Sequence, residues 1–166
     1  MKKLLLLLLF IPLVSFGQDE LKLFIKGKNN FEKENYNKAS TYLNNALELN
    51  PSYVDAHFYT GLLNTKLKLY DKAILNYNKV LELDLYNELA YLNRGRINYI
   101  LKNREAAQSD FKNAIEIDSK FIEAYDNLVL VSQSLKDYET GVLAITKLIE
   151  FNPNFRNFYR RGLIKY

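Results

Sequence analysis

One short pattern recurs at a constant interval along this chain. It reads ALELNP, VLELDL, AIEIDS and LIEFNP, at residues 46–51, 80–85, 114–119 and 148–153. Small residues keep the same interval, at Gly27, Gly61 and Gly95 and again at Ala39, Ala73, Ala107 and Gly141. A fixed period of roughly 20–50 residues is typical of a solenoid, in which similar units stack and cover one another's apolar faces. The period therefore predicts a chain that offers a binding surface and has no single buried catalytic pocket.

Each unit divides into two helical stretches. In the unit 54–87, we expect helices at about 54–67 and 71–83, joined by a tight turn at 68–70. The apolar residues of the second stretch recur at helical spacing and so form one stripe. Asp71 is placed to cap that helix at its first turn. Gly61 has no side chain and Ala73 a small one, so the two helices are expected to approach closely there.

These positions together resemble the tetratricopeptide repeat (TPR). A large residue opens the pattern at Leu23, His57, Tyr91 and Tyr125; a small one follows at Gly27, Gly61 and Gly95; and the second helix carries Leu43, Tyr77, Phe111 and Ile145, then Ala46, Val80, Ala114 and Leu148. The fourth unit departs from the pattern. Val129 stands at the small position of its first helix, and Leu148 stands where the second helix has Ala46, Val80 or Ala114 in the other units. These exchanges indicate that the two helices of this unit pack in a shifted way.

The resemblance implies an all-α fold, a right-handed α-solenoid of about four TPR helix pairs plus a C-terminal helix. The expected TPR domain spans 18–166, with repeats at about 20–53, 54–87, 88–121 and 122–155. In the terminal helix, 156–166, residues 158–162 echo 91–95. Two interpretations of this helix stay open: it caps the last apolar face, as stacked repeats require, or the chain is a truncated part of a larger TPR protein.

The resemblance also implies that the first helix of each unit lines a concave groove. The expected partner-binding residues are Phe24, Lys28, Phe31, Phe58, Leu62, Lys66, Leu92, Arg96, Tyr99, Ile100 and Leu130. So many large apolar groups on one face favour an apolar groove for an extended peptide or amphipathic helix of a protein partner. The alternative is that several of them pack against neighbouring units.

Two further classes of partner are disfavoured. TPR proteins that clamp the carboxylate of a chaperone peptide use Lys and Asn in the groove, and only Lys28 and Asn93 could contribute here. Lys and Arg number 23 against 19 Asp and Glu, which is too balanced for a nucleic-acid partner.

We expect a monomer or weak self-association. The alternative function is that of a structural or self-associating repeat piece.

Residues 1–17 resemble a secretory signal peptide. Lys2 and Lys3 precede an apolar run at 4–14, and Ser15-Phe16-Gly17 supplies small residues at the exit. The exit sequence before Gln18 is similar to that of exported proteins of the Bacteroidetes type. We expect cleavage after Gly17 and a periplasmic or secreted protein. The run is too short to span a bilayer, so no stable membrane anchor is expected after cleavage.

The residues give no support for catalysis. The chain has no Cys, and His57 is its single histidine. His57 falls at a packing position, where we expect it to be buried or half-buried. A lone His cannot assemble a zinc site of the usual type, and it has no evident triad partners. We therefore predict no enzyme activity, no catalytic residues, no metal and no cofactor. Arg156, Arg160 and Arg161 form a small basic cluster, interpreted as a solvated surface or as a contact for an anionic partner or a membrane surface.

Overall fold

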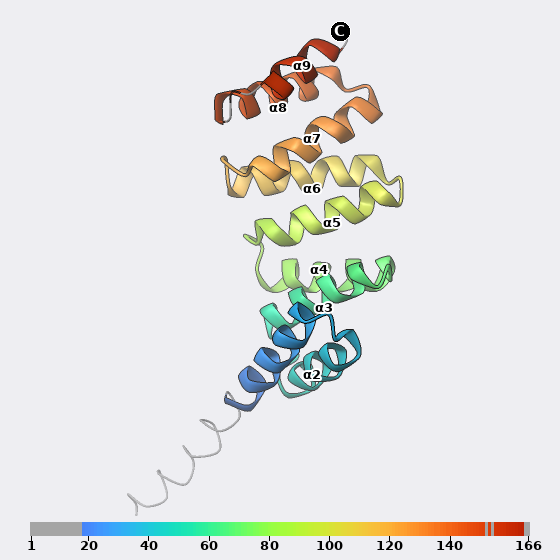
Figure 1. The fold of residues 1–166 in the computed structure, drawn as a ribbon, viewed down its shortest axis with the longest axis vertical. Helices are drawn as coiled ribbons and strands as arrows, with labels where there is room; N and C mark the ends of the chain where they lie inside the picture. Colours follow the sequence, from blue (N-terminus) through green and yellow to red (C-terminus); the bar gives the residue numbers. More distant parts are fainter. Residues whose placement is uncertain (1–17, 152, 154, 165–166) are drawn as a thin grey trace, which may run out of the picture. The chain divides into compact units, whose positions relative to one another are not determined.

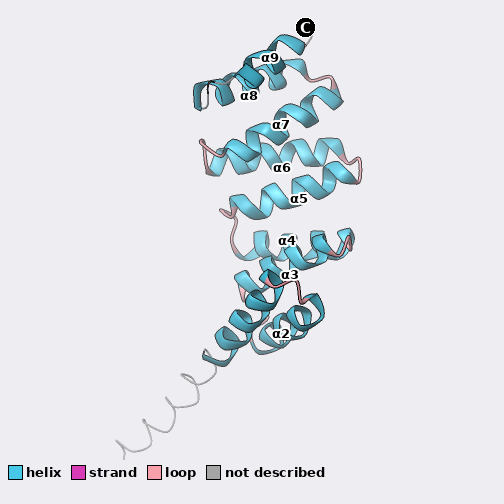
Figure 2. Cartoon of the chain, in the orientation of Figure 1, coloured by secondary structure: helices cyan, strands magenta, loops and turns pink. Residues whose placement is uncertain are grey.

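The computed structural model describes residues 18–151, 153 and 155–164, and these residues form helices and turns without any strand. Figures 1 and 2 show successive helices running back and forth as antiparallel pairs. The predicted all-α class is therefore confirmed. The chain divides into two compact units, which we call unit 1, ending at Leu83, and unit 2, beginning at Asp84. The predicted signal peptide lies outside the described residues.

The helices keep the predicted order. Unit 1 contains a helix at 18–32, then α2 Tyr36–Leu49, α3 Val54–Lys66 and α4 Tyr70–Leu83; unit 2 contains α5 Glu88–Ile100, α6 Arg104–Ile117, α7 Ile122–Leu135, α8 Tyr138–Phe151 and α9 Phe155–Leu163. The predicted turn at 68–70 begins one residue earlier, because α3 ends at Lys66, and Tyr70 already opens α4. Asp71 lies inside the first turn of α4, where a negative charge favours the helix N-terminus. We call the first helix of each pair helix A and the second helix B.

The family positions of helix B form the core of both units. At most 1% of each side chain is exposed at Leu43, Ala46, Tyr77, Val80, Phe111, Ala114, Ile145 and Leu148. Ala39, Ala73 and Ala107 are fully buried as well. Burying a Leu- or Phe-sized side chain stabilises a fold by roughly 1.5–3 kcal/mol, so this stripe fixes how each pair packs.

The glycines of helix A lie where helix B crosses closest. A Cβ atom on Gly61 would stand 2.7 Å from the ring of Tyr77, and one on Gly95 would stand 2.7 Å from the ring of Phe111. Both rings are buried, so they have little room to move aside. The predicted close approach at Gly61 is confirmed, because any side chain there would collide with helix B.

The fourth repeat distributes its bulk differently. Val129 takes the helix A position that glycine holds elsewhere, and it is fully buried. Gly141 replaces alanine in α8, and a Cβ on it would meet Ser132 at 3.6 Å and Ile164 at 3.7 Å, which is ordinary contact distance. The larger residue has thus moved to helix A and the smaller one to helix B.

The four turns between helix A and helix B share one backbone geometry. A non-glycine residue with positive φ stands in each: 59° at Glu34 and Lys68, 67° at Lys102 and 61° at Lys136. In the second turn, the Lys68 N–H donates to the Thr65 carbonyl and the Leu69 N–H to the Asn64 carbonyl, at 3.0 and 2.8 Å. The same two bonds recur in the other three turns. This is the Schellman motif, which normally uses glycine at the left-handed residue.

Candidate functional site: the helix A faces and neighbouring surfaces

The aromatic groove residues of unit 1 are largely engaged in packing. Phe24 is 9% exposed, and its ring centroid lies 5.1 Å from that of Tyr53 and 5.4 Å from that of Tyr59. Phe31 and Phe58 are half-buried and contact the Tyr59 ring at 5.9 and 6.2 Å. Tyr59 therefore serves as a common neighbour for these rings, and Phe24 belongs to the core.

Of the remaining unit 1 residues of the predicted groove, only Lys66 is exposed, whereas Lys28 is half-buried. The Lys28 ammonium lies 5.5 Å from the centre of the Tyr59 ring, a cation–π geometry. Leu62 is half-buried as well. The unit 1 face is thus an aromatic layer with a lysine over one ring.

In unit 2 the predicted residues are mostly exposed. Tyr99, Ile100 and Leu130 are 38%, 53% and 46% exposed, and Arg96 is exposed too. The exception is Leu92, which is 3% exposed and packs in the core cluster of unit 2. Four of the five predicted unit 2 residues are therefore available to a partner.

Three helices of unit 2 enclose a hollow of about 310 Å³. Its lining residues are Arg96 from α5, Glu123, Asp126, Asn127 and Leu130 from α7, and Arg160 from α9. Arg160 donates from Nη1 to Oδ1 of Asp126, which ties α9 to α7. We call this hollow, with Tyr99 and Ile100, the unit 2 helix A face. Sequence reasoning identified Arg160 only as part of a basic cluster and did not predict its contact with Asp126.

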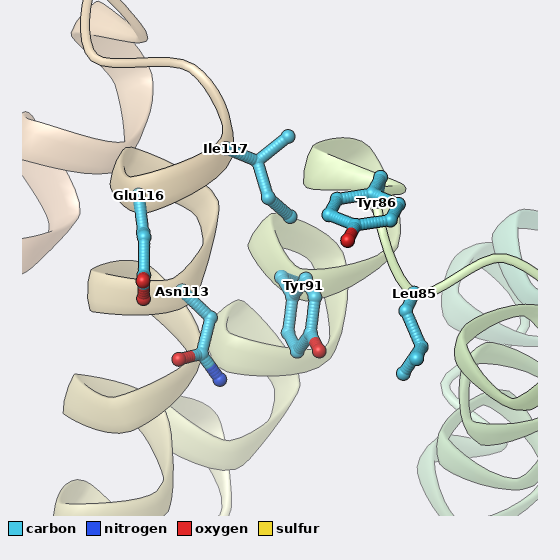
Figure 3. A pocket seen from close by; sticks show the side chains of 6 residues that line it. All are labelled: Leu85, Tyr86, Tyr91, Asn113, Glu116 and Ile117. Atoms are coloured by element: carbon cyan, nitrogen blue, oxygen red, sulfur yellow. The ribbon is translucent and has the colours of Figure 1, made fainter.

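A second hollow of unit 2, of about 430 Å³, lies beside the loop before α5. Figure 3 shows its lining side chains: Leu85 and Tyr86 from the loop, Tyr91 from α5, and Asn113, Glu116 and Ile117 from α6. Leu85 and Tyr86 are 64% and 80% exposed. The sequence showed Leu85 as a departure from the family proline, but it gave no sign of a hollow there.

A buried polar network joins α5 to α6. Asp110 is 3% exposed, and it accepts hydrogen bonds from Arg94 Nη2 at 2.6 Å and from Asn98 Nδ2 at 3.1 Å. The Arg94 guanidinium also lies 5.4 Å from the centre of the Tyr91 ring. Burial of a charged pair is tolerated only where its remaining polar atoms are satisfied, and Asn98 fulfils that requirement here. Sequence reasoning missed this network.

Tyr77 and Asp137 have shifted ionisation. Burial raises the pKa of the Tyr77 hydroxyl to about 12, against a smaller lowering by its contact with Thr65. The pKa of Asp137 is lowered by hydrogen bonds from Thr140, with a contribution from Gln108. The Tyr77 shift thus follows from helix packing, and the Asp137 shift from hydrogen bonds at the start of α8.

His57 is half-buried, as expected. Its Nε2 lies 2.8 Å from the Pro51 carbonyl oxygen and its Nδ1 lies 3.4 Å from the Asn76 side-chain oxygen. Within the described part of the chain, no three His, Asp or Glu side chains are grouped so as to hold a metal ion. The helices at 18–151 and 155–164 also include none with the length and apolar character needed to cross a bilayer.

Comparison with known proteins agrees with the repeat geometry. The sequence profile of the tetratricopeptide repeat matches residues 23–53, 58–87 and 89–121. No curated protein sequence is significantly similar. Among solved structures, the MamA protein is 24% identical with a TM-score of 0.82, covering 89% of this chain and 81% of that one.

Two other solved structures share the fold. YrrB, described as a TPR protein with an unusual peptide-binding site, is 17% identical with a TM-score of 0.80, covering 89% of this chain and 77% of its own. The first TPR domain of Spaghetti (RPAP3), bound to the HSP90 peptide SRMEEVD, is 24% identical with a TM-score of 0.69, covering 71% and 94%. At these identities the likeness is one of fold alone.

Proposed function

Because this chain belongs to the tetratricopeptide repeat family, we propose that it is a protein–protein interaction module that binds a peptide or helix of its partner on the unit 2 helix A face. The family fold is typical of such modules. One observation carries the proposal: Tyr99, Ile100 and Leu130 are large apolar residues that are 38–53% exposed, and Leu130 lines a hollow.

The chemistry of this face indicates the kind of peptide it takes. Leu130 lies in the hollow among two arginines, Arg96 and Arg160, and the acids Glu123 and Asp126. An apolar side chain of the partner would seat against Leu130, while the mixed charges at the rim fix orientation more than affinity. Asp126 already pairs with Arg160, so Arg96 and Glu123 are the charges best placed to contact the partner.

The same face argues against a carboxylate clamp. Arg96 of α5 lines the hollow and could bind a carboxylate. However, Glu123 and Asp126 line the same hollow. A peptide ending in several acids would therefore meet two carboxylates beside the arginines. We propose a partner segment whose contacts with this face are mainly apolar. Its affinity should change little with salt concentration, because screening weakens exposed charge pairs and leaves the burial of apolar surface intact.

The proposal is tested by selecting peptides from a displayed library on the mature chain, followed by affinity measurements on two variants. Leu130→Asp places a charge in the hollow and should weaken the selected peptides at least tenfold. Leu143→Asp is the matched control, because Leu143 is 64% exposed on α8 of the same repeat. Peptides that bind both variants equally, or a failure to select any peptide, would contradict the proposal.

We also propose that the chain is exported, with cleavage after Gly17, to the periplasm or the medium. The support is the sequence itself: Lys2 and Lys3, the apolar run at 4–14 and the small-residue exit. The match to the repeat profile begins at residue 23, after this segment. Mass spectrometry of the protein from its native host should find Gln18 at the start, and intact chains in the cytosol would reject export.

A further inference from the structure

Helix α9 carries the same residue types that α5 uses to pack against α6, the helix B of its pair. In α5, an aromatic residue, an arginine and a glycine stand at Tyr91, Arg94 and Gly95. In α9 the same three types stand at the same spacing, at Phe158, Arg161 and Gly162, which we call the α9 dock. The arginine also takes the same pose, 5.4 Å from the Tyr91 ring in α5 and 5.7 Å from the Phe158 ring in α9.

In α5 this arrangement is filled by α6. The carboxylate of Asp110 receives the Arg94 guanidinium, and Phe111 covers Gly95 so closely that a Cβ there would lie 2.7 Å from its ring. Gly27 and Gly61 are covered in the same way, by Leu43 and Tyr77. Each of these three helix A glycines therefore has a large helix B side chain against it.

In α9 the arrangement is open. A Cβ on Gly162 would have no heavy atom of the described structure within 4 Å. Phe158 is 47% exposed, and Arg161 is exposed beside it. The opposite side of α9 is engaged, because Ile164 is 4% exposed and faces Gly141 of α8. The α9 dock is thus the unfilled face of a helix that is already packed on the rest of unit 2.

We propose that the α9 dock binds an amphipathic helix of helix B type that carries an acidic residue directly before a large apolar one. The acid would pair with Arg161, as Asp110 pairs with Arg94, and the apolar side chain would fill the space over Gly162. Small residues three positions before and four positions after the acid would allow close approach, as Ala107 and Ala114 do in α6.

Charge complementarity favours this occupant over a second copy of the chain. Two α9 docks packed face to face would bring the exposed Arg161 of each copy into one interface. Like charges placed together in this way oppose association. An acidic helix meets the same guanidinium with the opposite sign, and a charge-assisted bond of that kind is stronger than a neutral one.

The probe for this proposal is a fluorescein-labelled synthetic peptide with the sequence of residues 103–121, which contains α6 with Asp110 and Phe111. A free helix of this length is only marginally stable in water, so we expect a dissociation constant in the range of roughly 1–100 μM after the peptide orders. Fluorescence anisotropy against the mature chain measures it.

Two protein variants locate the binding. Gly162→Leu fills the open space and Arg161→Glu reverses the charge, and each should weaken the peptide at least tenfold. Circular dichroism should show no loss of melting temperature for Gly162→Leu, because no described atom stands near that position and glycine is the weaker helix former. Lys120→Glu is the matched charge control, an exposed residue on the loop before α7, and should leave binding within twofold of the original.

Changes in the peptide complete the test. Asp110→Lys in the peptide should abolish binding to the original chain and partly restore it to Arg161→Glu, which a nonspecific apolar contact would not do. Absence of binding would overturn the proposal. Binding that Gly162→Leu does not weaken would overturn it too, since that result is expected if the peptide displaced α6 from α5. So would a dimer of the chain, seen by sedimentation, that Gly162→Leu dissolves. The unit 2 helix A face is tested separately, since Leu130→Asp should leave this peptide unaffected.

Discussion

Unit 1 and unit 2 share one repeat frame but join their helices with different chemistry. Among the described residues, six of the seven close ring pairs lie in unit 1, where Tyr59 contacts three phenylalanines. Unit 2 joins its helices through charged and polar groups, with Asp110 between Arg94 and Asn98 and with Arg160 on Asp126. The frame therefore fixes where atoms must be small or buried, and leaves open how the space is filled.

The contrast is sharpest between equivalent positions of the second and third repeats. Thr60 and Asn76 of unit 1 donate to backbone carbonyls one turn back in their own helices. Their equivalents one repeat later, Arg94 and Asp110, bond to each other across the helix pair. Such a pair specifies its partner more strictly than an apolar contact, and its loss leaves a buried group without compensation.

The largest expected effect follows from breaking that pair. Asp110→Ala leaves Arg94 and Asn98 without their acceptor and should lower the free energy of unfolding by about 3–5 kcal/mol. Asn76→Ala, at the equivalent position of unit 1, removes a bond to the Lys72 carbonyl and a long 3.4 Å contact with His57 on a half-buried side chain, and should cost less than about 1 kcal/mol. Hydrogen exchange measured by mass spectrometry assigns each loss to its unit.

Removal of both charges provides the control for this comparison. Arg94→Met combined with Asp110→Leu should cost less than Asp110→Ala alone, because no unpaired charge stays buried. Equal losses for Asp110→Ala and Asn76→Ala would show that the two units do not differ in the way their structures indicate.

A second contrast appears at alkaline pH, at Tyr77 and its unit 2 equivalent Phe111. Unfolded tyrosine titrates near pH 10, whereas burial raises the pKa of Tyr77 to about 12. The unfolded state therefore loses its proton first, so stability is complete below about pH 10 and falls by roughly 2–3 kcal/mol as pH rises to 12. Urea midpoints at pH 8 and pH 11.5 should show a smaller drop for Tyr77→Phe than for the original chain.

The variant Tyr77→Phe should behave almost normally at pH 8. The Tyr77 hydroxyl lies 3.4 Å from Thr65 Oγ1, a long contact, so its loss should cost less than about 1 kcal/mol. If the alkaline drop is the same with and without the hydroxyl, Tyr77 does not determine the pH response of unit 1.

The helix crossings test whether the shared frame is equally tight in both units. Gly61→Leu and Gly95→Leu each force a side chain toward a buried ring 2.7 Å away. Overpacking of this kind typically costs about 1–3 kcal/mol, and we expect similar losses at the two sites by thermal melting. If the melting temperature is unchanged in either variant, the two helices leave more space at that crossing than the structure shows.

The smallest expected effect has the opposite sign. Gly141→Ala adds a methyl group at ordinary contact distance inside α8, where alanine stands in the other repeats. Removing glycine from a helix at a compatible position should raise the free energy of unfolding by about 0.4–1 kcal/mol. A loss of stability, detected by the urea midpoint, would show that Ser132 and Ile164 leave less room than their distances suggest.

The sequence predicted the helices and the core because both follow from the fixed repeat period and the spacing of small and large residues. It could not decide which groove residues are exposed. That outcome depends on neighbours such as Tyr59, whose ring packs against Phe24 and Phe31 from the preceding repeat. The two interpretations of the groove each describe one unit: the aromatic residues of unit 1 pack, whereas Tyr99, Ile100 and Leu130 of unit 2 are exposed. Their role in binding stays a prediction.

The sequence did not predict the buried polar network, because that network depends on which residues are paired across two helices. Arg94 and Asp110 are ordinary charges on a helical surface until α5 and α6 are packed together. The left-handed turns escaped for a different reason, since the usual signal for them is glycine and none of the four turns contains it.

Those turns make the stability of the array adjustable in small steps. A left-handed backbone costs a residue with a Cβ roughly 1–2 kcal/mol, and the positive charge of Lys68, Lys102 and Lys136 beside the carbonyl end of helix A offsets part of that cost. Because the four positions are exposed and each lies one repeat from the next, exchanges there should act almost independently. Evolution, or an engineer, could thus tune how firmly the two helices of each repeat pack by changing one exposed turn residue, while the residues of both proposed binding surfaces stay unchanged.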